Sequence, residues 1–369
     1  MKLYIGDNIK RLRRQKGITQ ETLAERVHVS IAAVSKWERN ESLPDISLLL
    51  PLASYFGVST DELLGLNAAK NEERIQEIMN ERNRLCALGK SHEAFDLIVA
   101  AYEEFSNDWR IVEEYMWKLY YDPNCEEPYG HEVHKEELYR LCERVLDDCV
   151  VDQVRYSALS ILGGLYVLDG RLDKAVETAK RFPTLIFTQA EELQGCYEKG
   201  STEWWMHTRA KVAEFAEFLM VDIRDMALAT EETHEAICIL KKAIALMELI
   251  FDEGDYHFWN YHLAELHIWI AHRCVRIRDL DAAYAHFEQG LQYAKAYDDL
   301  PQTAKHTSIL VRNNTFDRHN INSDTEQNEV ARELGYLFES NSYRELKDTP
   351  QMQAIVAKYK PFIGTKKQQ

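Results

Sequence analysis

The sequence is poor in residues that interrupt helices, with eight prolines and 15 glycines among 369 residues. Proline breaks helices and central strands, and 46% of the residues are hydrophobic. These features favour a mostly helical globular protein with a large core. No run of eighteen apolar residues is present, which predicts no membrane-spanning helix. The first 17 residues also lack the apolar stretch of a signal peptide.

Cysteines are few and dispersed, and no CxxC pair occurs. The seven are Cys86, Cys125, Cys142, Cys149, Cys196, Cys238 and Cys274. An odd, scattered set argues against a disulfide framework and for reduced thiols. We therefore predict a cytoplasmic protein.

Signatures of catalysis and of metal binding are also missing. Four histidines lie five residues apart, at His257, His262, His267 and His272. Each step of five turns about 140° around a helix, so these side chains do not share a face. No nucleophile elbow or catalytic Cys–His signature is present. We expect no metal and no cofactor, and an enzyme is the weakest functional hypothesis.

Basic residues are scarce overall, since 44 Lys and Arg stand against 61 Asp and Glu, a net charge of −17. The imbalance is uneven. Residues 1–69 hold nine basic and eight acidic residues, a net charge of +1, which leaves −18 for the rest. An acidic body repels phosphate, so any nucleic-acid contact is expected in the first 69 residues alone.

The clearest local pattern lies in residues 18–58. Thr19 can cap a helix that runs to about Val27, and Ser30 can cap a second that runs to about Arg39. Two short helices joined by a tight turn form a helix-turn-helix, whose second helix fits the major groove of DNA.

Residues 4–66 resemble the helix-turn-helix of the phage-repressor (Xre) type. The motifs are Thr19-Gln20, Leu23-Ala24, Val34-Ser35-Lys36-Trp37-Glu38, Leu43-Pro44-Asp45, Leu52-Ala53, Phe56-Gly57-Val58 and Asp61-Glu62-Leu63-Leu64. The resemblance implies a five-helix domain that binds double-stranded DNA. It also implies a buried ion pair between Arg13 and Glu38. His28 stands where the family usually has glycine, and a left-handed backbone there is costly for a side chain.

The resemblance also assigns the DNA contacts. The positions that read bases are Gln20, Ile31, Ala32, Ala33 and Lys36. The positions suited to phosphate are Thr19, Ser30, Arg39 and Asn40. Alanine or isoleucine can contact a thymine methyl group, and lysine can donate to guanine O6 and N7; helix N-termini suit phosphate. The alternative is that this face packs on the rest of the protein.

From residue 72 to about 297 the pattern is helix after helix. Four of these helices place alanine at the first inward position and an apolar or small residue four positions later. The pairs are Ala94 and Ile98, Ala175 and Ala179, Ala236 and Leu240, and Ala283 and Phe287. The residues Leu162-Gly163, Tyr166 and Gly170 resemble the first helix of a tetratricopeptide repeat. The intervals between these alanines are 81, 61 and 47 residues, not a constant 34. We predict an α-solenoid of degenerate helix pairs, with a generic helical bundle as the alternative.

The end of the chain is less regular. Residues 299–324 are polar and look loop-rich, and helices are expected at 325–339 and 350–359. Aromatic residues cluster at Tyr256 to Trp269. Most should fill the core, but an exposed subset could line a peptide-binding wall, where Asn260 could hold a peptide backbone.

These observations predict an all-α protein. Residues 1–67 form a repressor-type DNA-binding domain, and residues 68–369 form a helical sensor and dimerisation domain. The layout resembles the peptide-pheromone receptors of Gram-positive bacteria. The first hypothesis is a dimeric, sequence-specific transcriptional regulator with a possible peptide or small-molecule effector. The second is a protein-interaction scaffold in which the helix-turn-helix is secondary. No membrane partner is expected.

Overall fold

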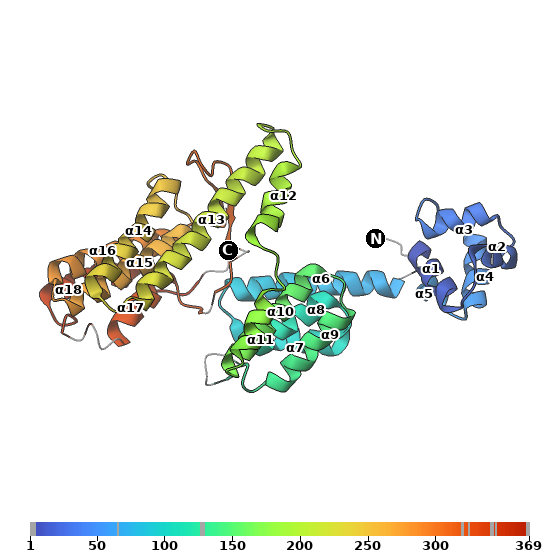
Figure 1. The fold of residues 1–369 in the computed structure, drawn as a ribbon, viewed down its shortest axis with the longest axis horizontal. Coiled ribbons are helices and arrows are strands. Elements are labelled where there is room, and N and C mark those ends of the chain that lie inside the picture. The colour runs from blue at the N-terminus through green and yellow to red at the C-terminus, as the bar shows by residue number, and fades with distance from the viewer. Residues whose placement is uncertain are drawn as a thin grey trace. The chain divides into compact units, whose positions relative to one another are not determined.

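The computed structural model describes residues 5–64, 66–125, 130–318, 321–323, 325–339, 343 and 345–366 (Figure 1). The chain divides into two compact units, Met1–Glu81 and Arg82–Gln369. None of the described helices is long and apolar enough to cross a membrane. All seven cysteines are free thiols.

The first unit is a small helical domain around one apolar core. Its helices are α1 (Ile5–Gln15), α2 (Gln20–Arg26), α3 (Ile31–Glu38), α4 (Ile46–Phe56), α5 (Thr60–Leu64) and the start of α6 (Leu66–Ala87). The side chains of Ile9, Leu23, Val34, Leu52 and Leu63 are fully buried together. This confirms the five helices expected in residues 1–67.

The predicted junction between residues 67 and 68 lies in a helix. Residues 67–71 belong to α6, which continues without a break to Ala87. The division between the two units falls inside this helix, at Glu81 and Arg82. The domain boundary predicted after residue 67 therefore lies within a helix, near its start.

The second unit is also almost entirely helical. Its first helices are α7 (Ser91–Phe105), α8 (Trp109–Tyr120), α9 (Lys135–Asp148), α10 (Asp152–Leu168), α11 (Leu172–Ala179), a 3₁₀ turn η1 (Leu185–Phe187) and α12 (Gln189–Gly195). The later helices are α13 (Thr202–Ala229), α14 (Thr233–Ile250), α15 (Trp259–Arg276), α16 (Leu280–Asp298), α17 (Glu329–Glu339), α18 (Pro350–Tyr359) and a 3₁₀ turn η4 (Lys360–Phe362).

Successive helices of this unit pack as neighbours, as Figure 1 shows for α14, α15 and α16. The helices predicted to pair, α10 with α11 and α15 with α16, are in contact. Ala94, Ala236 and Ala283 are buried at their inward positions. Small residues there let helices approach closely, which accounts for their place in the pattern.

One predicted inward position is wrong. Ala179 is exposed, and Thr178 is buried in its place. The inward step along α11 is three residues, from Ala175 to Thr178, and Ala179 is the last residue of the helix, before the C-cap Lys180.

The segment after α16 holds the only β-structure within the described ranges. Strands β1 (Thr303–Lys305) and β2 (Thr315–Asp317) form an antiparallel hairpin. The chain then contacts the end of α6, where Ser323 N donates to Cys86 O at 2.9 Å. A Cβ on Gly89 would lie 2.0 Å from the carbonyl oxygen of Thr325. The helix expected from residue 325 begins only at Glu329, and α18 has the predicted bounds.

Candidate nucleic-acid interface and effector pocket

The helix pair α2–α3 is fixed by its caps and by one left-handed residue. Thr19 Oγ1 accepts from Thr22 N at 3.1 Å, and Ser30 Oγ accepts from Ala33 N at 3.2 Å. Both N-caps are as predicted. His28, in the turn, has φ +55°. The left-handed backbone expected at this family glycine position is therefore present with histidine in place.

The third helix has an inner and an outer face. Val34 and Trp37 are buried, as their spacing predicted. Ile31, Ala32 and Lys36 are exposed, with Ile31 47% accessible. Ala33 is half-buried. Within the part of the chain that the structure describes, the Lys36 amine makes no hydrogen bond or ion pair. The outer face is thus a small apolar surface with one cation available to a partner.

A buried ion pair locks α1 against α3. Arg13 Nε lies 2.5 Å from Glu38 Oε1, and Arg13 Nη2 lies 3.0 Å from Oε2. Gln20 Nε2 also donates to Glu38 Oε2, at 2.8 Å. Burial alone would raise the pKa of Glu38, but the hydrogen bonds and the Arg13 charge outweigh it and lower that pKa. The ion pair expected from the resemblance is confirmed, and the Gln20 amide donates to the same carboxylate.

The four residues suited to phosphate contact all lie at the edges of α2 and α3 and are exposed. The Ser30 hydroxyl accepts its cap bond and keeps its O–H proton for another acceptor, whereas the Thr19 hydroxyl also shares a hydrogen bond of 3.0 Å with the Thr22 hydroxyl. Arg39 is bound to Glu41 by two hydrogen bonds, at 2.7 and 2.9 Å. An exposed pair of this kind is weak, so phosphate can compete for the guanidinium. Asn40 has a left-handed backbone, with φ +58°.

The second unit contains a pocket of about 780 Å³. One wall is α13, through Ala213, Glu214 and Glu217; another is the start of α15. The hairpin β1–β2, the segment 321–323 and α17 complete it. The aromatic lining is Phe258, Trp259, Tyr261, Tyr297 and Phe316. Part of the aromatic stretch at 256–269 therefore does face a cavity, and the size is that of a small-ligand site.

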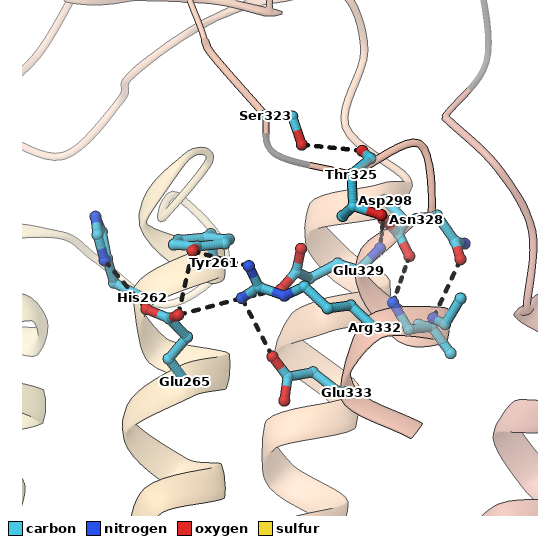
Figure 2. Close-up of polar contacts among 12 residues, drawn as sticks. Tyr261, His262, Glu265, Asp298, Ser323, Thr325, Asn328, Glu329, Arg332 and Glu333 are labelled. Atoms are coloured by element: carbon cyan, nitrogen blue, oxygen red, sulfur yellow. Dashed lines mark hydrogen bonds and ion pairs between the residues drawn. The ribbon is translucent and has the colours of Figure 1, made fainter. Parts of the chain in front are cut away.

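A network of charged residues borders this pocket (Figure 2). The Arg332 guanidinium lies 2.7 Å from Glu329, 3.2 Å from Glu265 and 3.4 Å from Glu333. Arg332 Nη1 also donates to the Tyr261 hydroxyl at 3.0 Å. Burial and neighbouring carboxylates raise the pKa of Glu329. Three carboxylates share one guanidinium here, and the Lys366 amine also lines the pocket.

The first turn of α17 is held by a carboxylate from another helix. Asp298, the last residue of α16, accepts hydrogen bonds from the backbone N–H groups of Glu329 and Val330, at 2.8 and 3.0 Å (Figure 2). A carboxylate at a helix N-terminus satisfies orphan donors and the helix dipole. Asn328 Oδ1 also accepts from Ala331 N at 3.1 Å, so both side chains fix the start of α17, and with it Glu329 and Arg332 at the pocket.

Asn260 lies outside the pocket lining. It is 6% accessible, and its amide donates to the backbone oxygen of His257 at 2.9 Å. Its donor is therefore used within the turn that begins α15. A ligand contact by Asn260 remains a prediction. The polar groups that do line the cavity, above all Arg332, carry no local sequence signal that could have singled them out.

The capped helix pair, the left-handed turn and the exposed outer face of α3 define a helix-turn-helix domain joined to a helical body. The profile of the helix-turn-helix family matches residues 9–63. The transcriptional regulator ImmR of Bacillus subtilis is 35% identical over 90 residues, which are 21% of this chain and 71% of ImmR. This chain therefore belongs to the helix-turn-helix family of transcriptional regulators.

Two further comparisons extend the picture. The transcriptional activator BcrR of Enterococcus faecalis is 35% identical over 84 residues, so the chain spans only 41% of BcrR and the match 21% of this chain. The crystal structure of Bacillus thuringiensis PlcR with the peptide PapR7 and DNA is similar over 79% of this chain and 96% of PlcR. The identity is 15% and the TM-score 0.31, so the helical body is interpreted from its own contacts.

Proposed function

We propose that this protein is a sequence-specific transcriptional regulator that reads base edges in the DNA major groove with the outer face of α3. The observation that carries the proposal is the exposed set Ile31, Ala32 and Lys36 on a helix whose opposite face is buried. Apolar contact with thymine methyl groups and donation from Lys36 to guanine fit these side chains. Ala33 and Gln20 assist at the edge of this surface.

We further propose that the regulator works as a homodimer. One recognition helix reads only a few base pairs, and helix-turn-helix proteins reach specificity by placing two copies on half-sites about one turn apart. The body carries a net charge of −18 outside residues 1–69. It is therefore repelled by phosphate, and the DNA contact is confined to the first unit of each protomer.

The pocket in the second unit is proposed to bind the effector. Its aromatic walls supply apolar contact, and its polar groups converge from α13 and α17. A short peptide or a small molecule fits a cavity of about 780 Å³. Glu214, an exposed carboxylate on the α13 wall, suits an effector with a positively charged group.

The DNA assignment is tested by selecting genomic fragments with purified full-length protein at two salt concentrations. Wild type should enrich a two-fold symmetric site, with affinity falling as salt rises. Lys36→Glu should lower affinity for that site at least about tenfold, because one base contact contributes about 1–3 kcal/mol and the new carboxylate repels phosphate. Lys70→Glu makes the same charge change at an exposed position on α6 and should leave affinity nearly unchanged. Equal binding by both variants would reject the α3 assignment.

The effector assignment is tested by filling the pocket. Ala213 is half-buried in its wall, so Ala213→Trp should abolish the thermal shift that a library of short cationic peptides and amines produces in wild type. Ala229→Trp adds the same side chain at the exposed end of α13 and should preserve the shift. Loss of response in both variants would show that the effect is not specific to the pocket.

The second candidate is a protein-interaction scaffold. It is favoured by the acidic body and by the lack of Asn or Arg on the outer face of α3. A stoichiometric co-purifying protein, together with no salt-sensitive binding to any selected fragment, would support the scaffold over the regulator.

A further inference from the structure

Three potential metal ligands meet at one edge of the pocket. Asp255 and His257 lie in the turn between α14 and α15, and His306 follows β1 in the hairpin. One ligand atom from each lies within 4.8 Å of the other two. About fifty residues separate the turn from His306, so sequence spacing gave no sign of the cluster. His257 precedes α15, and the argument from histidines fanning around a helix does not apply to it.

The Asp255 carboxylate is held in one orientation. Its Oδ2 accepts hydrogen bonds from Thr307 N at 2.9 Å, from Ser308 N at 2.7 Å and from the Ser308 hydroxyl. These bonds fix Oδ2 and leave Oδ1, which lies 3.2 Å from His257 Nε2.

One ring nitrogen of each imidazole belongs to the cluster. His306 Nδ1 lies 2.9 Å from the backbone oxygen of Asp255. When Nδ1 donates there, Nε2 keeps the lone pair that binds metal, and a backbone acceptor on the other nitrogen is typical of metal-bound histidine.

His257 is strained and incompletely satisfied. Its backbone has φ +44°. Among the described residues, its buried Nε2 has no hydrogen-bond partner of good geometry, although Asp255 Oδ1 is 3.2 Å away. Strain at a residue whose ring nitrogen faces a carboxylate points to a function for that nitrogen. Ligands at 2.0–2.1 Å from a tetrahedral zinc ion are themselves roughly 3.3 Å apart, close to the 3.2 Å between His257 Nε2 and Asp255 Oδ1.

We propose that Asp255, His257 and His306 bind a divalent transition-metal ion of the zinc class, which ties the hairpin β1–β2 to the turn before α15. Two imidazole nitrogens and one carboxylate oxygen suit zinc, and three protein ligands leave a fourth position open. His306 also lines the pocket, so the ion lies at the wall of the cavity. The site does not depend on DNA binding or on an effector.

The test uses full-length protein freed of metal by a chelator and then titrated with Co²⁺ and with Zn²⁺. Wild type should take up one equivalent, with the visible absorption of four-coordinate cobalt, and Zn²⁺ should displace it. Zn²⁺ should also slow amide hydrogen exchange in residues 303–317. His257→Asn should weaken binding at least tenfold and abolish the exchange effect. Asparagine tolerates a left-handed backbone, so the turn is kept, and Asp255→Asn provides a second variant that retains an acceptor for Ser308.

The control is the other cluster of ligand-type residues, Asp122, Cys125 and His134. His134→Asn should leave uptake at one equivalent with unchanged affinity. The proposal is overturned if wild type takes up no stoichiometric metal, or if His257→Asn and Asp255→Asn, both folded by circular dichroism, bind as wild type does. Loss of binding in His134→Asn alone would likewise overturn it, because the ion would then occupy the other cluster.

Discussion

Replacing Glu38 with glutamine should destabilise the DNA-binding domain by breaking its buried ion pair. The Glu38 side chain is 3% accessible and that of Arg13 is 14% accessible. Without the carboxylate, the guanidinium keeps only the Ile18 carbonyl oxygen, at 2.8 Å, and one amide oxygen. Removing one partner of a buried pair costs about 3–5 kcal/mol. Because glutamine still accepts one hydrogen bond, we expect the lower end, about 3 kcal/mol.

Amide hydrogen exchange of the full-length protein measures this loss locally. A loss of about 3 kcal/mol corresponds to roughly 150-fold faster exchange in α1 and α3 when exchange requires local opening. Exchange in α15, in the other unit, should not change. The matched control is Glu41→Gln, which breaks the exposed Arg39–Glu41 pair, whose side chains are 55% and 50% accessible. An exposed pair contributes at most about 1 kcal/mol.

A double variant distinguishes the ion pair from simple packing. Arg13→Met with Glu38→Leu removes both charges and keeps apolar volume, so it should be less destabilised than the sum of the two single variants. Additive losses would mean that the two side chains act independently. A loss below about 1 kcal/mol for Glu38→Gln would refute a buried, tightly coupled pair.

Three further predictions concern pH and one close backbone approach. Because the pKa of Glu38 is lowered in the folded state, its stabilisation is present above its unfolded pKa and is lost as pH falls through the folded value. The exchange difference between wild type and Glu38→Gln should therefore shrink below about pH 4, and a constant difference would contradict this. For Glu329 the folded pKa is raised, so ionisation of this carboxyl destabilises the fold as pH rises. The melting temperature of Glu329→Gln minus that of wild type should therefore increase between pH 5 and 8, and a decrease would contradict this. Gly89→Ala should lower the melting temperature more than Gly170→Ala. Both glycines have left-handed φ, but only at Gly89 does a Cβ meet the Thr325 carbonyl. Equal melting temperatures would show that the segment around Thr325 moves aside without loss of stability.

Much of the first unit could be predicted from local sequence, because its determinants act over a few residues. A cap at Thr19 or Ser30 bonds to a backbone N–H three residues later, and the inner face of α3 follows from a spacing of three between Val34 and Trp37. Even the left-handed residue His28 occupies a recognisable turn position. The exposed α3 surface is the complement of that inner face, so it too could be read from the order of residues.

Some features of the second unit could be predicted from local sequence patterns, and others could not. The inward alanines Ala94, Ala236 and Ala283 were predictable, because helix pairs need small residues at close approach. The exposure of Ala179 was not, since it depends on where α11 ends. The start of α17 was only partly encoded locally: Asn328 caps the helix by accepting from Ala331 N at 3.1 Å, whereas Asp298, on another helix, accepts from the N–H groups of Glu329 and Val330.

By itself, the sequence determined an all-α chain, a capped helix-turn-helix near its N-terminus and an acidic body, since composition, capping and helical spacing are properties of neighbouring residues. Only the tertiary structure decided which distant groups share a site. It brings Tyr261 and Glu265 of α15 to Arg332 of α17, and it places Asp255 and His257 beside His306. Such contacts join residues tens of positions apart, and no local periodicity encodes them. Their pKa values and their ligand chemistry arise only when folding removes these groups from water.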